Sequence, residues 1–155
     1  MSKPSDRLRE LGITLPAVPK PVAAYVPSVR HGSLLFLSGQ IPFQEGRIAF
    51  AGMVPTHHGI EAAQQAARVC TLNALAVAAD AAGGIDRIAR IVKLVVYVAS
   101  APGFTEQHLV ANGASELLVS IFGDAGRHAR AAVGAPGLPL NAAVEVDLTC
   151  AIIDV

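Results

Sequence analysis

The segment that most constrains the fold is the stretch 143–153, near the C-terminal end. It alternates in the way that a β-strand does when its two faces meet different surroundings. One set of alternate positions is apolar throughout: Val144, Val146, Leu148, Cys150 and Ile152. The other set is mixed: Glu145, Asp147, Thr149, Ala151 and Ile153. The first face must lie against a core, and the mixed face fits an interface between subunits better than open water.

Two helical segments can cover that apolar face. The Ala-rich stretch 56–82 has a helical pattern, and a second helix is expected from Thr105, as its N-cap, to Gly123. Further strands are expected at 23–29, 33–39, 87–100 and 128–134, with a short one at 47–50. The first two of these are separated by residues 30–32 only, a spacing that predicts a hairpin.

This order of elements predicts a single α+β domain over residues 1–155. Both helices are expected on one face of a mixed sheet of four to six strands, each joining parallel neighbours. Residues 1–21 are expected to form a short helix, capped by Ser5 or Asp6, and an extended Pro-rich arm.

The composition argues against several classes of function. Lys and Arg number 12, as do Asp and Glu, and no basic run is present, so nucleic acid is not an expected partner. No uninterrupted apolar run reaches the roughly 18 residues of a membrane helix, and no signal peptide is visible. We therefore expect a cytoplasmic protein with no membrane partner. The low charged fraction of 15%, against 52% hydrophobic residues, favours apolar surface that another subunit covers.

Several polar residues outside the last strand have simple structural interpretations. Cys70 and Cys150 lack metal-site spacing and are expected to be core residues of a reduced protein, with a catalytic thiol as the alternative. His57 and His58 are adjacent, and no cluster of carboxylates or thiols completes a metal site around them, so no metal is expected. Asn73 lies in an apolar helix and is expected to be a buried hydrogen bonder.

One cation and one carboxylate stand out in the C-terminal part of the chain. Arg130 and Glu145 are the only charged residues between Arg127 and Asp147. If the two last strands are neighbours around the loop 135–142, both side chains can lie near one cleft. An Arg offers a bidentate fork for a carboxylate or phosphate, and a Glu can polarise a water or relay a proton. The alternative from spacing alone is a structural ion pair between them.

Short motifs along the chain resemble the YjgF/RidA family, the reactive intermediate deaminases, whose members are also labelled endoribonuclease L-PSP-like. The C-terminal set is Ala-Arg-Ala-Ala-Val at 129–133, Leu-Pro at 138–139 and Val-Glu-Val at 144–146. The N-terminal set is Ser-Gly-Gln-Ile-Pro at 38–42, with Tyr25 thirteen residues before Ser38. The resemblance covers about residues 22–153, and the N-terminal arm indicates a longer branch of the family.

The resemblance implies a chorismate-mutase-like fold and a homotrimer whose sheets form a central barrel, with a ligand cleft at each subunit interface. It implies hydrolysis of 2-imino or 2-enamino acids to 2-keto acids and ammonia, without metal or organic cofactor. Arg130 would grip the substrate carboxylate, and Glu145 would position the attacking water or shuttle its proton. Backbone groups of Gly39 and Ala132 would hold the water or leaving group. Tyr25 would line the pocket from the neighbouring subunit.

Further positions bear on substrate and activity. Ser38 is expected to line the pocket, and His108 stands where typical members carry Asn. His108 is therefore a surface residue, an interface contact or a pocket base. His128 replaces a common proline, and Ala131 and Ala132 replace Ser and Cys; these departures leave the substrate open.

Two other functions are compatible with the resemblance. One is a non-catalytic trimer that binds a 2-keto acid or a related carboxylate, which needs Arg130 but not Glu145. The other is an endoribonuclease, against which the zero net charge argues. The hydrolase requires Arg130 and Glu145 to share a crevice. If the two side chains lay on opposite faces of the sheet with no crevice between them, this would count against the hydrolase.

Overall fold

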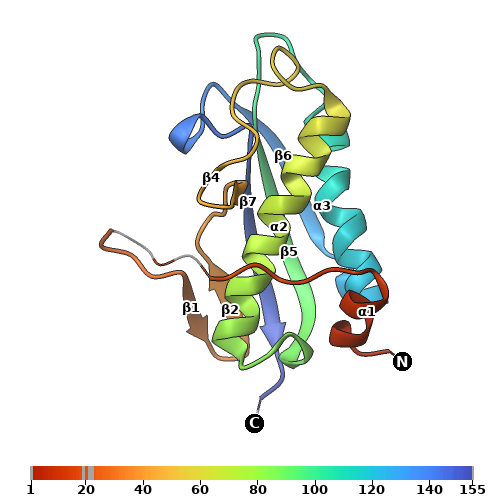
Figure 1. Ribbon diagram of the computed structural model, residues 1–155. Coiled ribbons are helices and arrows are strands. Elements are labelled where there is room, and N and C mark those ends of the chain that lie inside the picture. Colours follow the sequence, from red (N-terminus) through yellow and green to blue (C-terminus); the bar gives the residue numbers. More distant parts are fainter. Residues whose placement is uncertain (1, 19, 21–22, 155) are drawn as a thin grey trace.

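The computed structural model describes residues 2–18, 20 and 23–154. Helices α2 (Ile60–Ala82) and α3 (Gln107–Phe122) pack side by side on one face of a five-stranded sheet (Figure 1). The predicted α+β class, with both helices on one face, is confirmed. No helix in the described part of the chain is long and apolar enough to cross a membrane.

The sheet is mixed, as predicted, and its strand order is β1-β2-β7-β5-β6. Its strands are β1 (Ser28–His31), β2 (Leu34–Leu37), β5 (Ile88–Ala99), β6 (Ala129–Ala135) and β7 (Val144–Ile152). The pair β5–β6 is parallel, and the three other pairs are antiparallel. The predicted hairpin is present as β1–β2, but β1 begins at Ser28 and includes Arg30 and His31, which the prediction assigned to the turn. A separate small hairpin joins β3 (Phe43–Gln44) to β4 (Arg47–Ile48).

Two expectations about neighbouring strands are wrong. Helix α3 does join parallel neighbours, β5 and β6, but α2 connects β2 to β5 with β7 lying between them. The last two strands, β6 and β7, do not pair either, because β5 lies between them. The physical reason is burial: β5 and β7 each carry a row of large apolar side chains, whereas β6 is mostly Ala and Gly. The central places bury more apolar area, so the strand with small side chains lies at the edge.

The apolar face of β7 lies under the helices as the alternation predicts, and all five of its predicted side chains are buried. Strand β5 departs from simple alternation, which puts Ile91 on the face opposite to Leu94. Both are fully buried, because the pairing with β7 shifts by one residue between Ile91 and Lys93. Such a β-bulge turns the side chains beyond it over to the other face.

Both long helices begin later than predicted. Residues 53–58 form a turn in which the Met53 N–H donates to His57 Nδ1 at 2.9 Å, and the His58 ring bonds to the Ala51 carbonyl at 2.8 Å. The turn includes residues 56–58, which the sequence pattern predicted to be the first residues of the helix. Helix α2 therefore starts only after Gly59. In α3 the N-cap is Glu106, not Thr105.

The N-terminal helix α1 (Pro4–Glu10) is fastened to the body, and the arm follows it. The predicted cap at Ser5 or Asp6 is wrong, because the N-cap is Lys3 and no side chain caps the helix. The Ser5 hydroxyl and N–H instead donate to the Asp86 carboxylate at 2.7 and 2.8 Å. Residues 13–18 then cross α2 without helix or strand (Figure 1). The last part of the predicted arm, at 19 and 21, lies outside the described residues.

The two long helices meet at a close backbone contact. A Cβ atom added to Gly113 of α3 would lie 2.5 Å from the Gln64 carbonyl oxygen of α2. The Gln64 amide in turn donates from Nε2 to the Leu109 carbonyl at 2.8 Å. The absence of a side chain at 113 therefore sets how closely the helices approach.

We expect Gly113→Ala to lower the free energy of unfolding by about 1–3 kcal/mol, because the helices must separate to admit the methyl group. An exposed helical Gly→Ala change raises stability by about 1 kcal/mol, so the sign of the effect is diagnostic. Urea unfolding measures it. Gly137→Ala is the control, because a Cβ at 137 meets open space. A Gly113→Ala protein as stable as the wild type would contradict the close contact.

Candidate functional site

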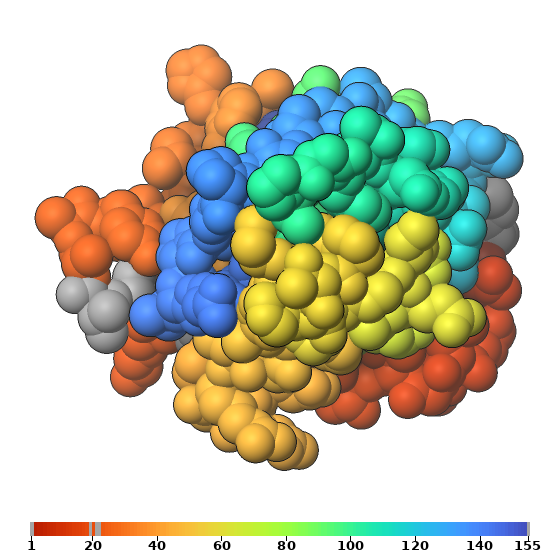
Figure 2. All heavy atoms as spheres, turned by 90° about the horizontal axis from the view of Figure 1, so that it is seen from above, coloured from red at the N-terminus to blue at the C-terminus, as the bar shows by residue number. Residues whose placement is uncertain are grey.

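A hollow of about 470 Å³ brings together four of the residues that the sequence singles out. They are Tyr25, Ser38, Gly39 and Glu145, which come from the segment before β1, the end of β2 and the start of β7. Pro139, in the loop after β6, closes one side, and Lys20 is the cationic side chain among the described lining residues. In Figure 2 this loop (blue) and the segment that carries Tyr25 (orange) project on the same side of the molecule.

Glu145 is half-buried at the wall of this hollow. Burial raises the pKa of its carboxyl group, and the nearby Asp147 charge raises it further. The carboxylate lies directly against Gly39, where an added Cβ would collide with Glu145 Oε1. The backbone there is fixed to β7, because Gln40 and Val146 exchange two N–H···O bonds of 2.8 and 2.9 Å. Gly39 thus gives the carboxylate its room.

Ser38 and Tyr25 line the same hollow but differ in role. The Ser38 hydroxyl donates to the Val26 carbonyl at 2.6 Å, and its N–H donates to the Pro27 carbonyl at 2.8 Å. Ser38 therefore holds the segment that carries Tyr25, whose side chain is exposed. Tyr25 lines the hollow together with Glu145 of its own chain. That a neighbouring subunit supplies Tyr25 to the substrate pocket stays a prediction.

Arg130 lies elsewhere, on the edge strand β6. It is level with Leu94 of β5, so it points to the helix-covered face. Its Nη1 donates to Asn112 Oδ1 at 2.9 Å and to Ser115 Oγ at 3.2 Å, and its Nη2 donates to the His108 carbonyl at 3.4 Å. Of the five N–H groups of a guanidinium, Nε–H and one on Nη2 then have no acceptor in the described part of the chain. These two form a fork for a carboxylate.

The second group of predicted residues gathers around Arg130. The backbone carbonyl of His108 accepts a hydrogen bond from Arg130, and the His108 side chain is exposed. Its role as a surface residue, an interface contact or a pocket base stays open. Ala132 shares the face of Arg130 and packs against the core. The sequence reasoning missed Asn112 and Ser115, although with His108 they follow the i, i+4, i+7 spacing of one helix face.

A single protomer keeps the two groups apart. Glu145 is level with Tyr97 of β5 and with Val133 of β6, on the sheet face opposite to that of Arg130. The expectation that neighbouring strands bring Arg130 and Glu145 to one cleft is therefore wrong. The alternative of an ion pair between them is wrong as well within the protomer, since none of the four ion pairs in the described residues includes either. A joint site requires a second copy of the chain.

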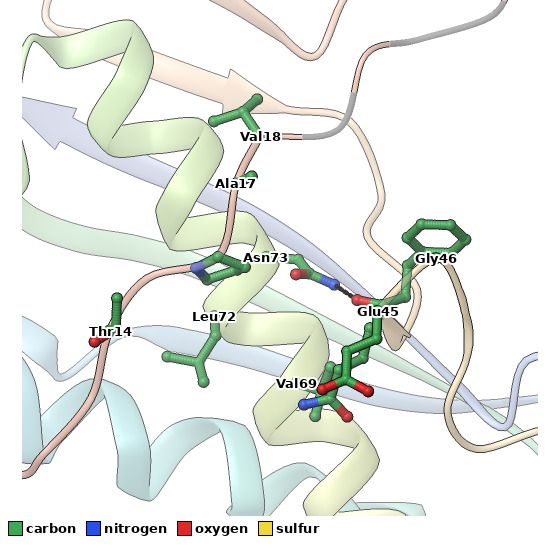
Figure 3. A pocket seen from close by; sticks show the side chains of 11 residues that line it. Thr14, Ala17, Val18, Glu45, Gly46, Val69, Leu72 and Asn73 are labelled. Atoms are coloured by element: carbon green, nitrogen blue, oxygen red, sulfur yellow. Dashed lines mark hydrogen bonds between the residues drawn. The ribbon is translucent and has the colours of Figure 1, made fainter.

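A second hollow, of about 560 Å³, holds none of the predicted catalytic or binding residues. It lies between the N-terminal arm, α2 and the β3–β4 hairpin, with Thr14, Val18, Leu72 and Asn73 around it (Figure 3). As expected, Asn73 is a buried hydrogen bonder, and its Nδ2 donates to the carbonyls of Ile41 and Phe43 at 3.1 and 2.9 Å.

The cysteines offer no nucleophile, and the described residues offer no metal site. Burial raises the pKa of the Cys150 thiol to about 11 and that of Cys70 well above its usual value. Protonated thiols are poor nucleophiles, so neither cysteine suits the alternative of a catalytic thiol. The described residues include no group of three or more His, Cys, Asp or Glu side chains that could hold a metal ion.

The raised pKa of Glu145 predicts a pH-dependent stability. Because burial disfavours the ionised form, the folded protein loses stability as the pH rises through the raised pKa. Glu145→Gln removes the ionisation, so the variant is expected to be more stable than the wild type at pH 7. The difference should shrink as the pH falls from the raised pKa toward about 4.3, the ordinary pKa of Glu, and be absent below it. Thermal unfolding between pH 4 and 8 checks it, with exposed Glu116→Gln as control. A gap that widens on acidification would contradict the assignment.

Comparisons with known proteins identify the family. The family model described as "YjgF/chorismate_mutase-like, putative endoribonuclease" matches residues 5–152. Protein TCP17 of Trypanosoma cruzi is 47% identical over 90% of this chain and 88% of its own. A solved structure of a protein of unknown function from Agrobacterium tumefaciens is 47% identical, with a TM-score of 0.89 over 97% of this chain and 93% of its own. A "putative endoribonuclease" from Shewanella oneidensis is 34% identical, with a TM-score of 0.93 over 97% and 100%. The chain belongs to the YjgF/chorismate mutase-like family.

Proposed function

We propose that the protein hydrolyses 2-imino acids, and their 2-enamino tautomers, to 2-keto acids and ammonia. Each site is assembled between two protomers of a homotrimer. One protomer contributes the hollow around Glu145, and its neighbour contributes Arg130. The observation that carries the proposal is the complementary state of the two groups: a half-buried carboxylate beside an open hollow, and a guanidinium with a free fork at a sheet edge.

The uncovered face of the sheet supports assembly between copies. The helices pack on the other face only, so the face that carries Glu145 is left open in the protomer (Figure 1). Large apolar side chains are exposed on this face and at its rim: Val29, Phe36, Val133 and Ile153. Exposed apolar area of this kind favours burial against another protein surface, and closed symmetry lets identical chains provide it.

The chemistry needs orientation of the substrate and the transfer of both water protons to the imine nitrogen. The Nε–H and Nη2–H of Arg130 bind the substrate carboxylate as a fork, which fixes the imine carbon relative to Glu145 of the neighbour. The Glu145 carboxylate takes a proton from a water as its oxygen adds to the C=N carbon, and passes it to the nitrogen to give a carbinolamine. It then takes the proton of the new hydroxyl group and passes it to the same nitrogen as the C–N bond breaks, so that the keto C=O forms and ammonia leaves. A carboxylate whose pKa is raised by burial is a stronger base, so this environment suits the role.

The non-catalytic binder is the second candidate, favoured by one observation. Arg130 keeps its fork without any help from Glu145, so carboxylate binding does not require the second group. The word endoribonuclease in the relatives' descriptions applies to those proteins. The zero net charge of this chain supports a small acid over an RNA backbone as the ligand.

Mixing two inactive variants tests the composite site. Arg130→Ala and Glu145→Gln are each expected to lower the acceleration of keto-acid release by about 100-fold or more, because substrate grip or the base is lost. An amino-acid oxidase supplies the imine, and semicarbazide competes for it. Random trimers from an equal mixture should regain about one quarter of wild-type activity, because one half of the chains supply Glu145 and the other half Arg130.

Each single variant, refolded alone in the same way as the mixture, is the control for activity. The measured mass of the assembly is the control for trimer formation. A mixture no more active than the mean of its two components would contradict a site shared between protomers. No acceleration by micromolar wild-type protein with several amino-acid donors would contradict the hydrolase. Undiminished function in Glu145→Gln would favour the binder.

A further inference from the structure

Behind Arg130, a histidine and a serine form a short hydrogen-bonded chain. His128 Nδ1 lies 2.6 Å from the Gly126 carbonyl oxygen, and its Nε2 lies 2.9 Å from Ser115 Oγ. A carbonyl oxygen can only accept, so Nδ1 carries a proton. In the neutral ring, Nε2 is then an acceptor, and the Ser115 hydroxyl donates to it. The hydroxyl proton is thereby committed to His128.

This commitment decides what Ser115 offers to Arg130. With its proton directed to His128, Ser115 Oγ turns a lone pair toward Arg130 Nη1, which donates to it at 3.2 Å. Together with Asn112 Oδ1 at 2.9 Å, this bond occupies both protons of Nη1. The orientation that results leaves Nε–H and one Nη2–H without an acceptor in the described part of the chain. Both His128 and Ser115 are half-buried, whereas Arg130 is exposed.

We propose that His128 is a positioning residue that, in its neutral form and through Ser115, holds Arg130 ready to bind a carboxylate. Protonation of His128 then weakens that binding, so the site releases small organic acids on acidification. The identity of the ligand class rests on the proposed function, whereas the link between His128 and Arg130 does not.

The charge balance around His128 favours the neutral ring near neutral pH. Burial lowers the pKa of His128, and the Arg130 charge lowers it further, against the Gly126 bond that raises it. The elements packed around the ring, α3, η2 (Gly123–Gly126) with the residue after it, and β5, carry other ionisable groups: His108, Glu116, Asp124, Arg127, Arg90 and Lys93. Arg130 is the one whose charge acts on the pKa of His128.

Protonation reverses the bond that the chain depends on. A proton on Nε2 makes the ring a donor toward Ser115 Oγ, so the hydroxyl proton must turn elsewhere and two cations then share one serine oxygen. The guanidinium and the imidazolium repel each other, which favours swinging the exposed arginine outward. A simple field effect has the opposite sign, because added positive charge would tighten carboxylate binding. The direction of the pH effect therefore separates positioning from electrostatics.

The first experiment follows Arg130 in the ligand-free protein. The NMR signals of the Arg130 Nε–H group and of the His128 ring are recorded from pH 5 to 8. Both are expected to shift with the same midpoint, below the ordinary histidine value of about 6.5. Ser115→Ala should leave the His128 titration in place and reduce the response of Arg130 to the part that direct repulsion between the two charges produces. An Arg130 signal that ignores the His128 midpoint, or follows it equally in Ser115→Ala, would overturn the link.

The second experiment measures benzoate binding over the same range, in which a carboxylate with a pKa near 4 stays ionised. The Glu145→Gln background removes the other carboxyl group that faces the ligand. Affinity is expected to fall about threefold to tenfold as the pH drops through the His128 midpoint. His128→Gln keeps an acceptor for Ser115 but cannot titrate, so it should retain the affinity found at pH 8 and lose the pH step. Ser115→Ala should bind weakly at every pH.

The two experiments fail separately. If Arg130 follows His128 but benzoate does not bind, the positioning link stands and the carboxylate ligand of the proposed function falls. If benzoate binds with an affinity independent of pH, or tighter at low pH, the positioning role falls and the proposed function stands. His128→Gln with an unchanged pH step would also overturn the role of His128.

Discussion

The whole architecture depends on burying one face of the strands β5 and β7 under two helices. In β7 the buried side chains alternate strictly with the others, so Glu145, Asp147 and Thr149 lie on the opposite face of the strand. Small residues at the helix contact, above all Gly113, let α2 and α3 lie close together on the same face of the sheet. In the described part of the chain, no helix packs on the opposite face. Everything on that opposite face is therefore either a surface or an interface.

This one-sided cover explains why the two candidate groups are separated. Arg130 follows the helix-covered face, where α3 provides acceptors for it, and Glu145 follows the open face, where Gly39 provides room. A side chain cannot pass through a hydrogen-bonded sheet, so the two groups stay on opposite faces of the protomer. The half-buried carboxylate and the guanidinium fork become parts of one site only when one chain meets another, which makes assembly a condition of the proposed chemistry.

The sequence was informative where local periodicity determines the outcome. The alternation of β7, the two helices and their common side of the sheet follow from spacing alone, because burial acts on each element separately. Strand order does not follow from spacing. The small side chains of β6 were visible, but their effect on its place in the sheet depends on competition with β5 and β7 for the centre. The β-bulge at Ile91 likewise leaves no mark in a pattern of apolar residues.

The candidate site follows the same division. Arg130 and Glu145 were singled out as residue types suited to carboxylate recognition and proton transfer, and these roles stay predictions. Their faces could not be assigned while the neighbours of β6 were unknown. Ser115 and Asn112 were missed because a polar residue on a helix is usually solvated, and only the tertiary contact to Arg130 gives them another use. The family resemblance placed the site residues in a common cleft but could not say which of them one chain brings together.

The small β3–β4 hairpin lines both the hollow around Glu145 and the hollow beside the N-terminal arm. Phe43 lines both of these hollows, so one residue of the hairpin is shared between them. The Asn73 amide holds the hairpin by donating to the backbone carbonyls of Ile41 and Phe43. A molecule in the hollow beside the arm would therefore contact a residue that also lines the hollow around Glu145.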